Sequence, residues 1–231
     1  MAKLIPDQAA GLRRLAGREG VQVITILAGH SGAGKTIAAT NLASALSRAG
    51  RAVKVVDTPL RNGLSPQVAA SLELNGEVPD VVLVDTPAHR LDACAWIEQT
   101  EIVIVLVPDA ESIKAGYSLL KQLHSEYGIG SFHVVLNQVT DRAAGDAIAR
   151  NFSAAAGRFL GVSVHYLGHI PHDLQLERAA RLKKSVVEAF PIAESARQFR
   201  QMADKLVSLP RLSSLSDLGD AMQRIVMSAA C

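Results

Sequence analysis

Short apolar runs recur along the chain, and they constrain its fold more than any other feature. Most are rich in valine and isoleucine and do not alternate with polar residues. This pattern is typical of strands that are buried on both faces of a parallel sheet. The predicted strands are Val21–Ala28, Ala52–Val56, Val81–Val84, Ile102–Val107, His133–Leu136 and Ser163–Leu167.

Stretches with helical spacing of apolar residues lie between these runs, at Thr36–Ala49, Ile113–Tyr127 and Ala143–Leu160. Strands that alternate with helices indicate βαβ units with right-handed crossovers. The sequence therefore predicts an α/β fold: a doubly wound, mostly parallel β-sheet with helices on both faces.

Two segments fall outside the alternation, Pro6–Gly17 and Arg211–Cys231. We therefore expect three parts: an N-terminal segment over 1–20, a nucleotide-binding domain over 21–209, and a C-terminal amphipathic helix over 210–231. A chain of 231 residues agrees with one main domain.

Composition excludes several classes of protein. The net charge is +2 and aromatic residues make up 4% of the chain, which argues against a DNA-coating protein and a base-stacking surface. The longest apolar runs, such as Ile102–Val107, are too short to cross a membrane. No signal peptide follows Lys3, and Cys94 and Cys231 make no disulfide framework, so a cytoplasmic location is expected.

The segment Gly29–Thr36 reads GHSGAGKT and fits the phosphate-loop pattern G-x-x-x-x-G-K-[ST] between a predicted strand and a predicted helix. Glycines allow backbone N–H groups to converge on phosphate oxygens, and the helix N-terminus favours negative charge. Lys35 is expected to reach the β- and γ-phosphates, and the Thr36 hydroxyl to bind Mg²⁺. The cofactors predicted are thus ATP or ADP with Mg²⁺, and the predicted phosphate contacts are Ser31, Gly32, Ala33, Gly34, Lys35, Thr36 and Ile37.

Two carboxylates follow predicted strands. Asp85 ends the run Val81–Val84, and Asp57 ends Ala52–Val56. A carboxylate at the end of a buried strand is costly unless it holds a metal or a hydrogen bond. We expect Asp85 to bind Mg²⁺ directly or through water, and Lys35, Asp57 and Asp85 to form the catalytic set. Capping of a following helix or turn is the alternative for each aspartate.

Later strand ends supply candidates for adenine binding. Asn137 closes one strand, and Pro171, His172 and Asp173 follow another. Ligands of open α/β sheets bind at the carboxyl ends of the strands. We therefore expect these four residues to contact the base.

Three stretches together give the chain a family resemblance. They are the phosphate loop with Asp85–Ala88, the long run Arg158–Pro191, and Asp7–Arg13, which reads DQAAGLR. With these, the chain resembles the MinD/ParA group of P-loop ATPases, and within it the flagellar-number regulators of the FlhG (FleN) branch. The third stretch matches the D-Q-A-x-x-L-R segment by which that branch contacts FlhF, a GTPase of the signal-recognition type.

The resemblance implies a cytoplasmic regulator of flagellar number and placement that docks on FlhF through Asp7, Gln8, Leu12 and Arg13. It makes Gln8 the side chain that stimulates GTP hydrolysis, in agreement with the ability of glutamine to orient an attacking water. It further implies an ATP-driven homodimer, a flagellar transcription factor or switch (C-ring) protein as a second partner, and no specific nucleic acid. From composition alone, Pro6–Gly17 is a plain amphipathic helix start with Asp7 as its N-cap.

The chain also departs from the family at four points. His30 stands where the family has a signature lysine that reaches the partner's nucleotide, and Pro59 replaces the second carboxylate of a D-x-D pair. His89 replaces a glycine of the switch segment, and only 28 positions separate Asp57 from Asp85, where family members are longer. These changes predict weak or absent ATPase activity and weaken the case for a dimer. The alternatives are a ParA-like ATPase that positions cargo on DNA and an adaptor with a relic nucleotide site.

The C-terminal stretch carries apolar residues at helical spacing: Leu212, Leu215, Leu218, Met222, Ile225 and Val226. The family uses such a helix for peripheral binding at the inner face of the cell membrane. Here Arg211 and Arg224 are offset by Asp217 and Asp220, whereas an interfacial helix favours a basic polar face. Membrane binding and packing on a protein surface are both left open by the sequence.

Overall fold

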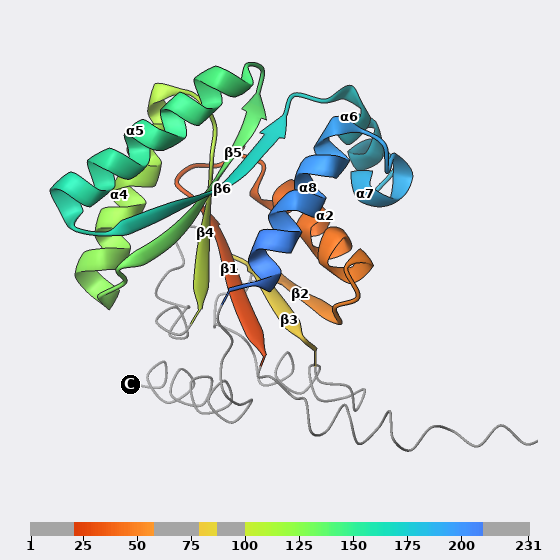
Figure 1. Ribbon diagram of the computed structural model, residues 1–231, viewed down its shortest axis with the longest axis horizontal. Coiled ribbons are helices and arrows are strands. Elements are labelled where there is room, and N and C mark those ends of the chain that lie inside the picture. Colours follow the sequence, from red (N-terminus) through yellow and green to blue (C-terminus); the bar gives the residue numbers. More distant parts are fainter. Residues whose placement is uncertain (1–20, 58–78, 87–99, 210–231) are drawn as a thin grey trace, which may run out of the picture.

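The computed structural model describes residues 21–57, 79–86 and 100–209. Within these ranges the chain forms one six-stranded sheet in the order β2-β3-β1-β4-β5-β6, and every neighbouring pair is parallel (Figure 1). The strands are β1 (Gln22–Ala28), β2 (Val53–Asp57), β3 (Val81–Asp85), β4 (Glu101–Leu106), β5 (Ser131–Val139) and β6 (Ser163–Pro171).

Helices follow the strands as the alternation predicts. They are α2 (Lys35–Arg48), α4 (Ala110–Tyr127), α5 (Arg142–Leu160), α6 (Leu174–Arg181), α7 (Val186–Ala189) and α8 (Glu194–Val207). Local sequence explains where several of them begin and end. Asp109 and Asp141 accept hydrogen bonds from the first turns of α4 and α5, and Gly128 and Gly161 end these helices in the left-handed conformation.

The helices form a layer on each face of the sheet. Helices α4 and α5 pack on one face around apolar residues such as Leu120 and Phe152, and α2, α6, α7 and α8 pack on the other around Leu42 and Phe199 (Figure 1). Strands β1, β3 and β4 are buried almost throughout. The prediction of a doubly wound parallel sheet is confirmed.

The strand order reverses at β1, which lies between β3 and β4. The chain leaves β1 toward one edge of the sheet and later crosses to the other side of β1. Open α/β sheets bind their ligands at such a point, beyond the carboxyl ends of the strands. The phosphate-loop motif follows β1 directly and therefore lies at this point.

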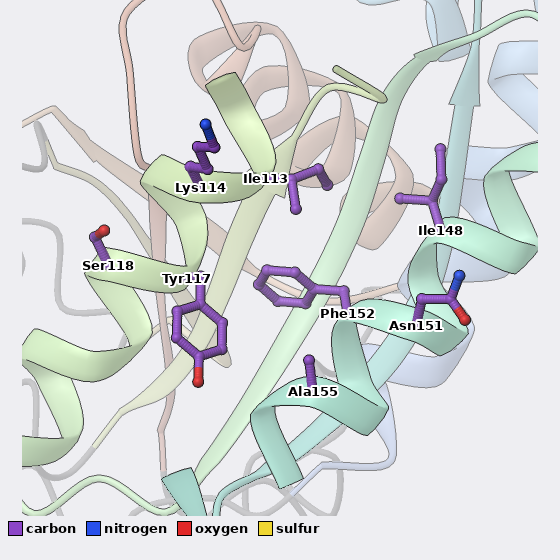
Figure 2. A pocket seen from close by; sticks show the side chains of 8 residues that line it. All are labelled: Ile113, Lys114, Tyr117, Ser118, Ile148, Asn151, Phe152 and Ala155. Carbon is purple, nitrogen blue, oxygen red and sulfur yellow. The ribbon is translucent and has the colours of Figure 1, made fainter. Parts of the chain in front are cut away.

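Helices α4 and α5 also border a groove of about 640 Å³ on the far side of the sheet from α2 (Figure 2). Tyr117 of α4 and Phe152 of α5 meet edge to face in its wall, with ring centroids 6.5 Å apart. The groove shares no residue with the predicted nucleotide site. It is therefore a separate feature of the surface.

Two of the three predicted parts, 1–20 and 210–231, lie outside the described residues. So do Asp7, Gln8, Leu12 and Arg13. Over the part of the chain that the structure describes, no helix has the length and apolar character needed to span a membrane.

Candidate nucleotide-binding site

The phosphate loop connects β1 to α2 through two glycines in the left-handed conformation. Gly32 has φ 86° and Gly34 has φ 83°, values that cost any residue with a Cβ about 1–2 kcal/mol. Gly34 is the N-cap of α2, and it makes no side-chain hydrogen bond to the first turn, which also contains no acidic residue. No acidic residue of the first turn opposes the positive dipole end of α2, which suits an anion.

The first residue of the loop is pressed against α4. A Cβ built on Gly29 would lie 2.5 Å from the carbonyl carbon of Ala115 and 2.7 Å from the backbone nitrogen of Gly116. These are backbone atoms of a helix, so they cannot move aside as the tip of a flexible side chain can. Glycine at position 29 is therefore required by the packing of α4 on the loop.

Three side chains of the predicted site meet beside the loop. The Lys35 ammonium forms an ion pair with the Asp85 carboxylate, and the Thr36 hydroxyl donates a hydrogen bond to Asp85 Oδ2 at 2.8 Å. Asp85 is 3% exposed and ends β3, the strand next to β1. A buried carboxylate needs such partners. The structure thus brings together the three residues to which the sequence assigns phosphate and metal binding.

These residues fit a magnesium nucleotide chemically. Carboxylate and hydroxyl oxygens are the protein ligands that Mg²⁺ prefers, and they belong to Thr36 and Asp85. Lys35 supplies the positive charge that phosphate oxygens require. Gly34 is required by its neighbour, since a Cβ there would overlap Asn137 Nδ2. A bound magnesium ion would neutralise phosphate charge at this place.

Asp57 also reaches this edge of the sheet. It ends β2 and pairs in register with Asp85 of β3. The two aspartates therefore occupy equivalent positions on neighbouring strands, as their places in the sequence predict. The catalytic role of Asp57 stays a prediction.

Asn137 lies against the phosphate loop. The residue is only 5% exposed, and its Nδ2 donates a hydrogen bond to the carbonyl oxygen of Ala33 at 2.8 Å. Its Oδ1 accepts from the backbone N–H of Gln138 at 2.9 Å. The structure therefore places this predicted adenine contact beneath the loop, with both ends of its amide engaged by protein.

Pro171, His172 and Asp173 follow at the end of β6. The backbone N–H of His172 donates to the Val139 carbonyl at 3.0 Å, which keeps this segment beside the end of β5. The exposed His172 imidazole lies 3.7 Å from Glu177. Pro171 and His172 are thus at the carboxyl edge of the sheet, where the sequence analysis expects them.

Asp173 is engaged by its own surroundings. One carboxylate oxygen accepts from the Gln175 N–H and caps α6, and the other accepts from Ser195 Oγ at 2.6 Å and from the Ser195 N–H at 3.1 Å. Burial alone would raise the pKa of the carboxyl, but hydrogen bonds from Ser195, Gln175 and Leu176 outweigh it and lower the pKa. Asp173 therefore joins α6 to α8, and contact with a base stays a prediction for it.

His30, at the position of the signature lysine, is folded back on its own loop. Its Nδ1 lies 2.6 Å from the carbonyl oxygen of Ser31, and because a carbonyl only accepts, Nδ1 is the donor. This geometry differs from that of a side chain extended toward another subunit. The two other departures at single positions, Pro59 and His89, lie outside the described residues.

Sequence reasoning missed the residues that support the site from other elements. Asn41 of α2 accepts from the Val186 N–H at 2.7 Å, and Ser185 Oγ donates to Ser44 Oγ at 2.7 Å, so α7 is fastened to the helix of the phosphate loop. Gly116 of α4 borders Gly29. The sequence signal for this contact is that Gly116 is an isolated glycine inside a helical pattern, which indicates close packing.

Comparison with known proteins agrees with this geometry. Residues 24–186 match the family described as the CobQ/CobB/MinD/ParA nucleotide binding domain. Antiactivator FleN of Pseudomonas aeruginosa is 26% identical over 254 residues, covering 86% of this chain and 91% of FleN.

Solved structures show the same fold at low identity. A chain of the MinC:MinD cell division protein complex of Aquifex aeolicus has a TM-score of 0.60 and 19% identity, over 84% of this chain and all of that one. MinD of Pyrococcus horikoshii OT3, complexed with Mg-ADP, has a TM-score of 0.58 and 17% identity, over 81% of this chain and 96% of that one. Because the family match spans most of the chain, the chain belongs to the CobQ/CobB/MinD/ParA nucleotide-binding family.

Proposed function

We propose that this protein is a regulator of flagellar number and placement that binds ATP or ADP with Mg²⁺ and acts on the GTPase FlhF. The observation that carries the nucleotide part is the meeting of Lys35, Thr36 and Asp85 beside the glycine loop. The likeness to an antiactivator, FleN, over most of both chains supports the regulatory part. The segment Asp7–Arg13 supports FlhF as the partner.

In this proposal, Lys35 exchanges its carboxylate partner for phosphate oxygens, while the N–H groups of the loop and of the first turn of α2 bind the remaining oxygens. Thr36 and Asp85 are the residues that would hold a magnesium ion, through their hydroxyl and carboxylate oxygens. Pro59 stands where the family has a second carboxylate, so we assign the orientation of water to Asp57.

We further propose that ATP hydrolysis is slow. His30 folds back on the loop instead of extending as a lysine would, and a neutral imidazole does not replace an ammonium in stabilising phosphate charge. We expect steady-state ATP turnover near background, with His30→Lys as the variant that raises it. Rapid turnover by the unmodified protein that is lost on Lys35→Ala would contradict this proposal.

The proposal for FlhF makes a direct prediction. We expect the protein to accelerate GTP hydrolysis by its cognate FlhF and Gln8→Ala to abolish the acceleration, because glutamine can orient the attacking water. Phosphate release from GTP is measured with FlhF in molar excess over this protein, which is added without bound GTP. Gln201→Ala, an exposed glutamine on α8, is the matched control and should stimulate normally. Absence of stimulation by the unmodified protein would contradict the proposed partner.

Other partners follow from the same proposal: a flagellar transcription factor or switch protein, a second copy of the chain, and the membrane surface through residues 211–231. Liposome co-sedimentation with and without 211–231 tests the last of these. A ParA-like protein that positions cargo on DNA is the competing function. It would bind DNA without sequence preference and lose that binding steeply as the salt concentration rises. This function does not explain the segment Asp7–Arg13.

A further inference from the structure

Basic residues gather at the corner of the molecule that α6 and α7 form (Figure 1). The stretch 178–184 reads RAARLKK and contains no acidic residue. Its basic residues are all exposed: Arg178, Arg181, Lys183 and Lys184. Arg181 also lies 3.7 Å from Glu177 of the same helix, but both side chains are on the surface, where such a pair is weak. The corner therefore presents positive charge to its surroundings.

Lys183 occupies a position that favours glycine. It follows the C-cap of α6 and has φ 54°. Its N–H donates to the Ala180 carbonyl, and the N–H of Lys184 donates to the Ala179 carbonyl, both at 3.0 Å. This is the Schellman end of a helix, in which the left-handed residue is usually glycine because a Cβ is strained there. A strained residue of this kind indicates a function for its side chain.

Large apolar side chains project beside these charges. Leu174 is 64% exposed, Leu182 is 60% exposed and Ile192 is 91% exposed. Leu174 begins α6, Leu182 is its C-cap, and Ile192 lies between α7 and α8. The walls of a groove shield the residues that line it, so side chains this exposed project from the surface instead. We call the exposed residues of 174–184, together with Ile192, the basic corner.

The backbone of the basic corner is held from two sides. The Asp173 carboxylate caps α6 and accepts hydrogen bonds from Ser195 of α8, at 2.6 Å from Oγ and 3.1 Å from the N–H. Arg200 Nη1 donates to the Pro191 carbonyl at 2.9 Å, directly before Ile192. The exposed side chains are therefore presented from a fixed backbone, which lowers the entropy cost of binding.

We infer that the basic corner binds an anionic lipid surface, with Leu182 and Ile192 entering the interface and the basic side chains contacting phosphate headgroups. Peripheral membrane surfaces combine apolar side chains with lysine and arginine in this way. Charge alone would fit DNA equally well, but contacts to DNA phosphates do not require projecting leucine and isoleucine. An acidic protein would need a separate pocket for each projecting side chain, whereas a bilayer accepts them in any arrangement.

The basic corner is separate from the C-terminal residues 211–231. Helix α8 runs from the corner toward the start of β1, where Gln22 donates to the Leu209 carbonyl at 3.4 Å. A helix of 14 residues is about 21 Å long, so the segment after Leu209 begins about that far from Ile192. The inference goes beyond the proposed function and depends on neither nucleotide nor FlhF.

Vesicle co-sedimentation of the full chain tests the inference. The probes are vesicles of phosphatidylcholine mixed with phosphatidylglycerol, and vesicles of phosphatidylcholine alone. We expect much tighter binding to the mixed vesicles, and Lys183→Gly should weaken it by about fivefold, the effect of one basic residue near an anionic surface. The same variant should be more stable to urea, because glycine relieves the strain at φ 54°. Its weaker binding therefore does not arise from unfolding.

Two variants control for charge. Lys183→Arg keeps the charge and should bind as the unmodified chain does. Lys121→Gln removes an exposed lysine of α4, on the other face of the sheet, and should also bind normally. If Lys183→Gly binds mixed vesicles as tightly as the unmodified chain, the inference is wrong. Equal losses in Lys183→Gly and Lys121→Gln would show an effect of net charge alone and would also overturn it.

Ile192→Ser separates lipid from other anionic partners. We expect it to weaken binding to mixed vesicles by about tenfold, because the aliphatic side chain no longer enters the interface. Phe159→Ser is the matched control, since Phe159 is also apolar and 68% exposed but lies near the end of α5; it should bind normally. Unchanged vesicle binding by Ile192→Ser would overturn the inference. Tighter binding of the unmodified chain to duplex DNA or to polyglutamate than to mixed vesicles would also overturn it, and would assign the corner to nucleic acid or to an acidic protein.

Discussion

Gly29→Ala should lower the free energy of unfolding by about 3 kcal/mol, at the upper end of the effects of overpacking. The added Cβ would lie 2.5 Å from the Ala115 carbonyl carbon and 2.7 Å from the Gly116 nitrogen. Relief requires α4 or the loop to shift as a backbone unit. We therefore expect the substitution to weaken nucleotide binding as well, because the loop starts at this residue. Urea denaturation measures the first effect, and titration with ADP and Mg²⁺ measures the second.

Gly130→Ala is the control for this experiment. Gly130 precedes β5, and a Cβ there would have no heavy atom within 4 Å. A substitution of this kind in open space stabilises by about 0.4–1 kcal/mol, since it restricts the unfolded chain. If Gly29→Ala and Gly130→Ala shift the denaturation midpoint in the same direction and to the same extent, α4 does not pack on the loop as described.

Lys35→Met should remove nucleotide binding and also destabilise the ligand-free protein. The ion pair is mostly buried, with the Asp85 side chain 4% exposed and that of Lys35 18% exposed. Removing one member of such a pair leaves a buried charge without its main partner, a loss of about 3 kcal/mol. We expect affinity for ADP with Mg²⁺ to fall by about 100-fold or more, as loss of a charged hydrogen bond to phosphate predicts.

A double-mutant cycle with Asp85→Asn separates these effects. Asparagine keeps an oxygen that can accept from Thr36 and carries no charge, so Lys35→Met/Asp85→Asn should recover most of the stability lost in Lys35→Met. It should recover none of the nucleotide affinity. Lys205→Met is the control, since Lys205 Nζ donates to the neutral Leu167 carbonyl at 2.6 Å, away from the loop. A double variant less stable than Lys35→Met would contradict the buried ion pair.

The fold could be predicted because its signal is local. Buried parallel strands such as β3 and β4 need valine and isoleucine on both faces, and the pattern of apolar runs records this directly. The pattern failed at strand ends. Strand β5 continues past Leu136 through polar residues to Val139, and β6 continues past Leu167 to Pro171. Asn137 and His169 are buried there, and their side chains carry no apolar signal.

The site could be predicted in its centre and not in its support. The spacing of the loop motif identifies Lys35 and Thr36, and a carboxylate after a buried strand identifies Asp85, because each depends on local geometry. The contact of Asn137 with Ala33 joins residues 104 positions apart. Such contacts depend on where the strand order places β5 relative to β1, which no local pattern contains.

The position of β1 in the middle of the sheet has a consequence for synthesis of the chain. Gln22, at the start of β1, donates to the Leu206 carbonyl at 2.8 Å across 184 positions. Asn41 of the loop helix depends in the same way on Val186, 145 positions later. A ribosome that has made the phosphate loop must therefore add most of the remaining chain before that loop gains its native surroundings. Contacts of such separation slow folding, and the unfinished sheet stays exposed during that time.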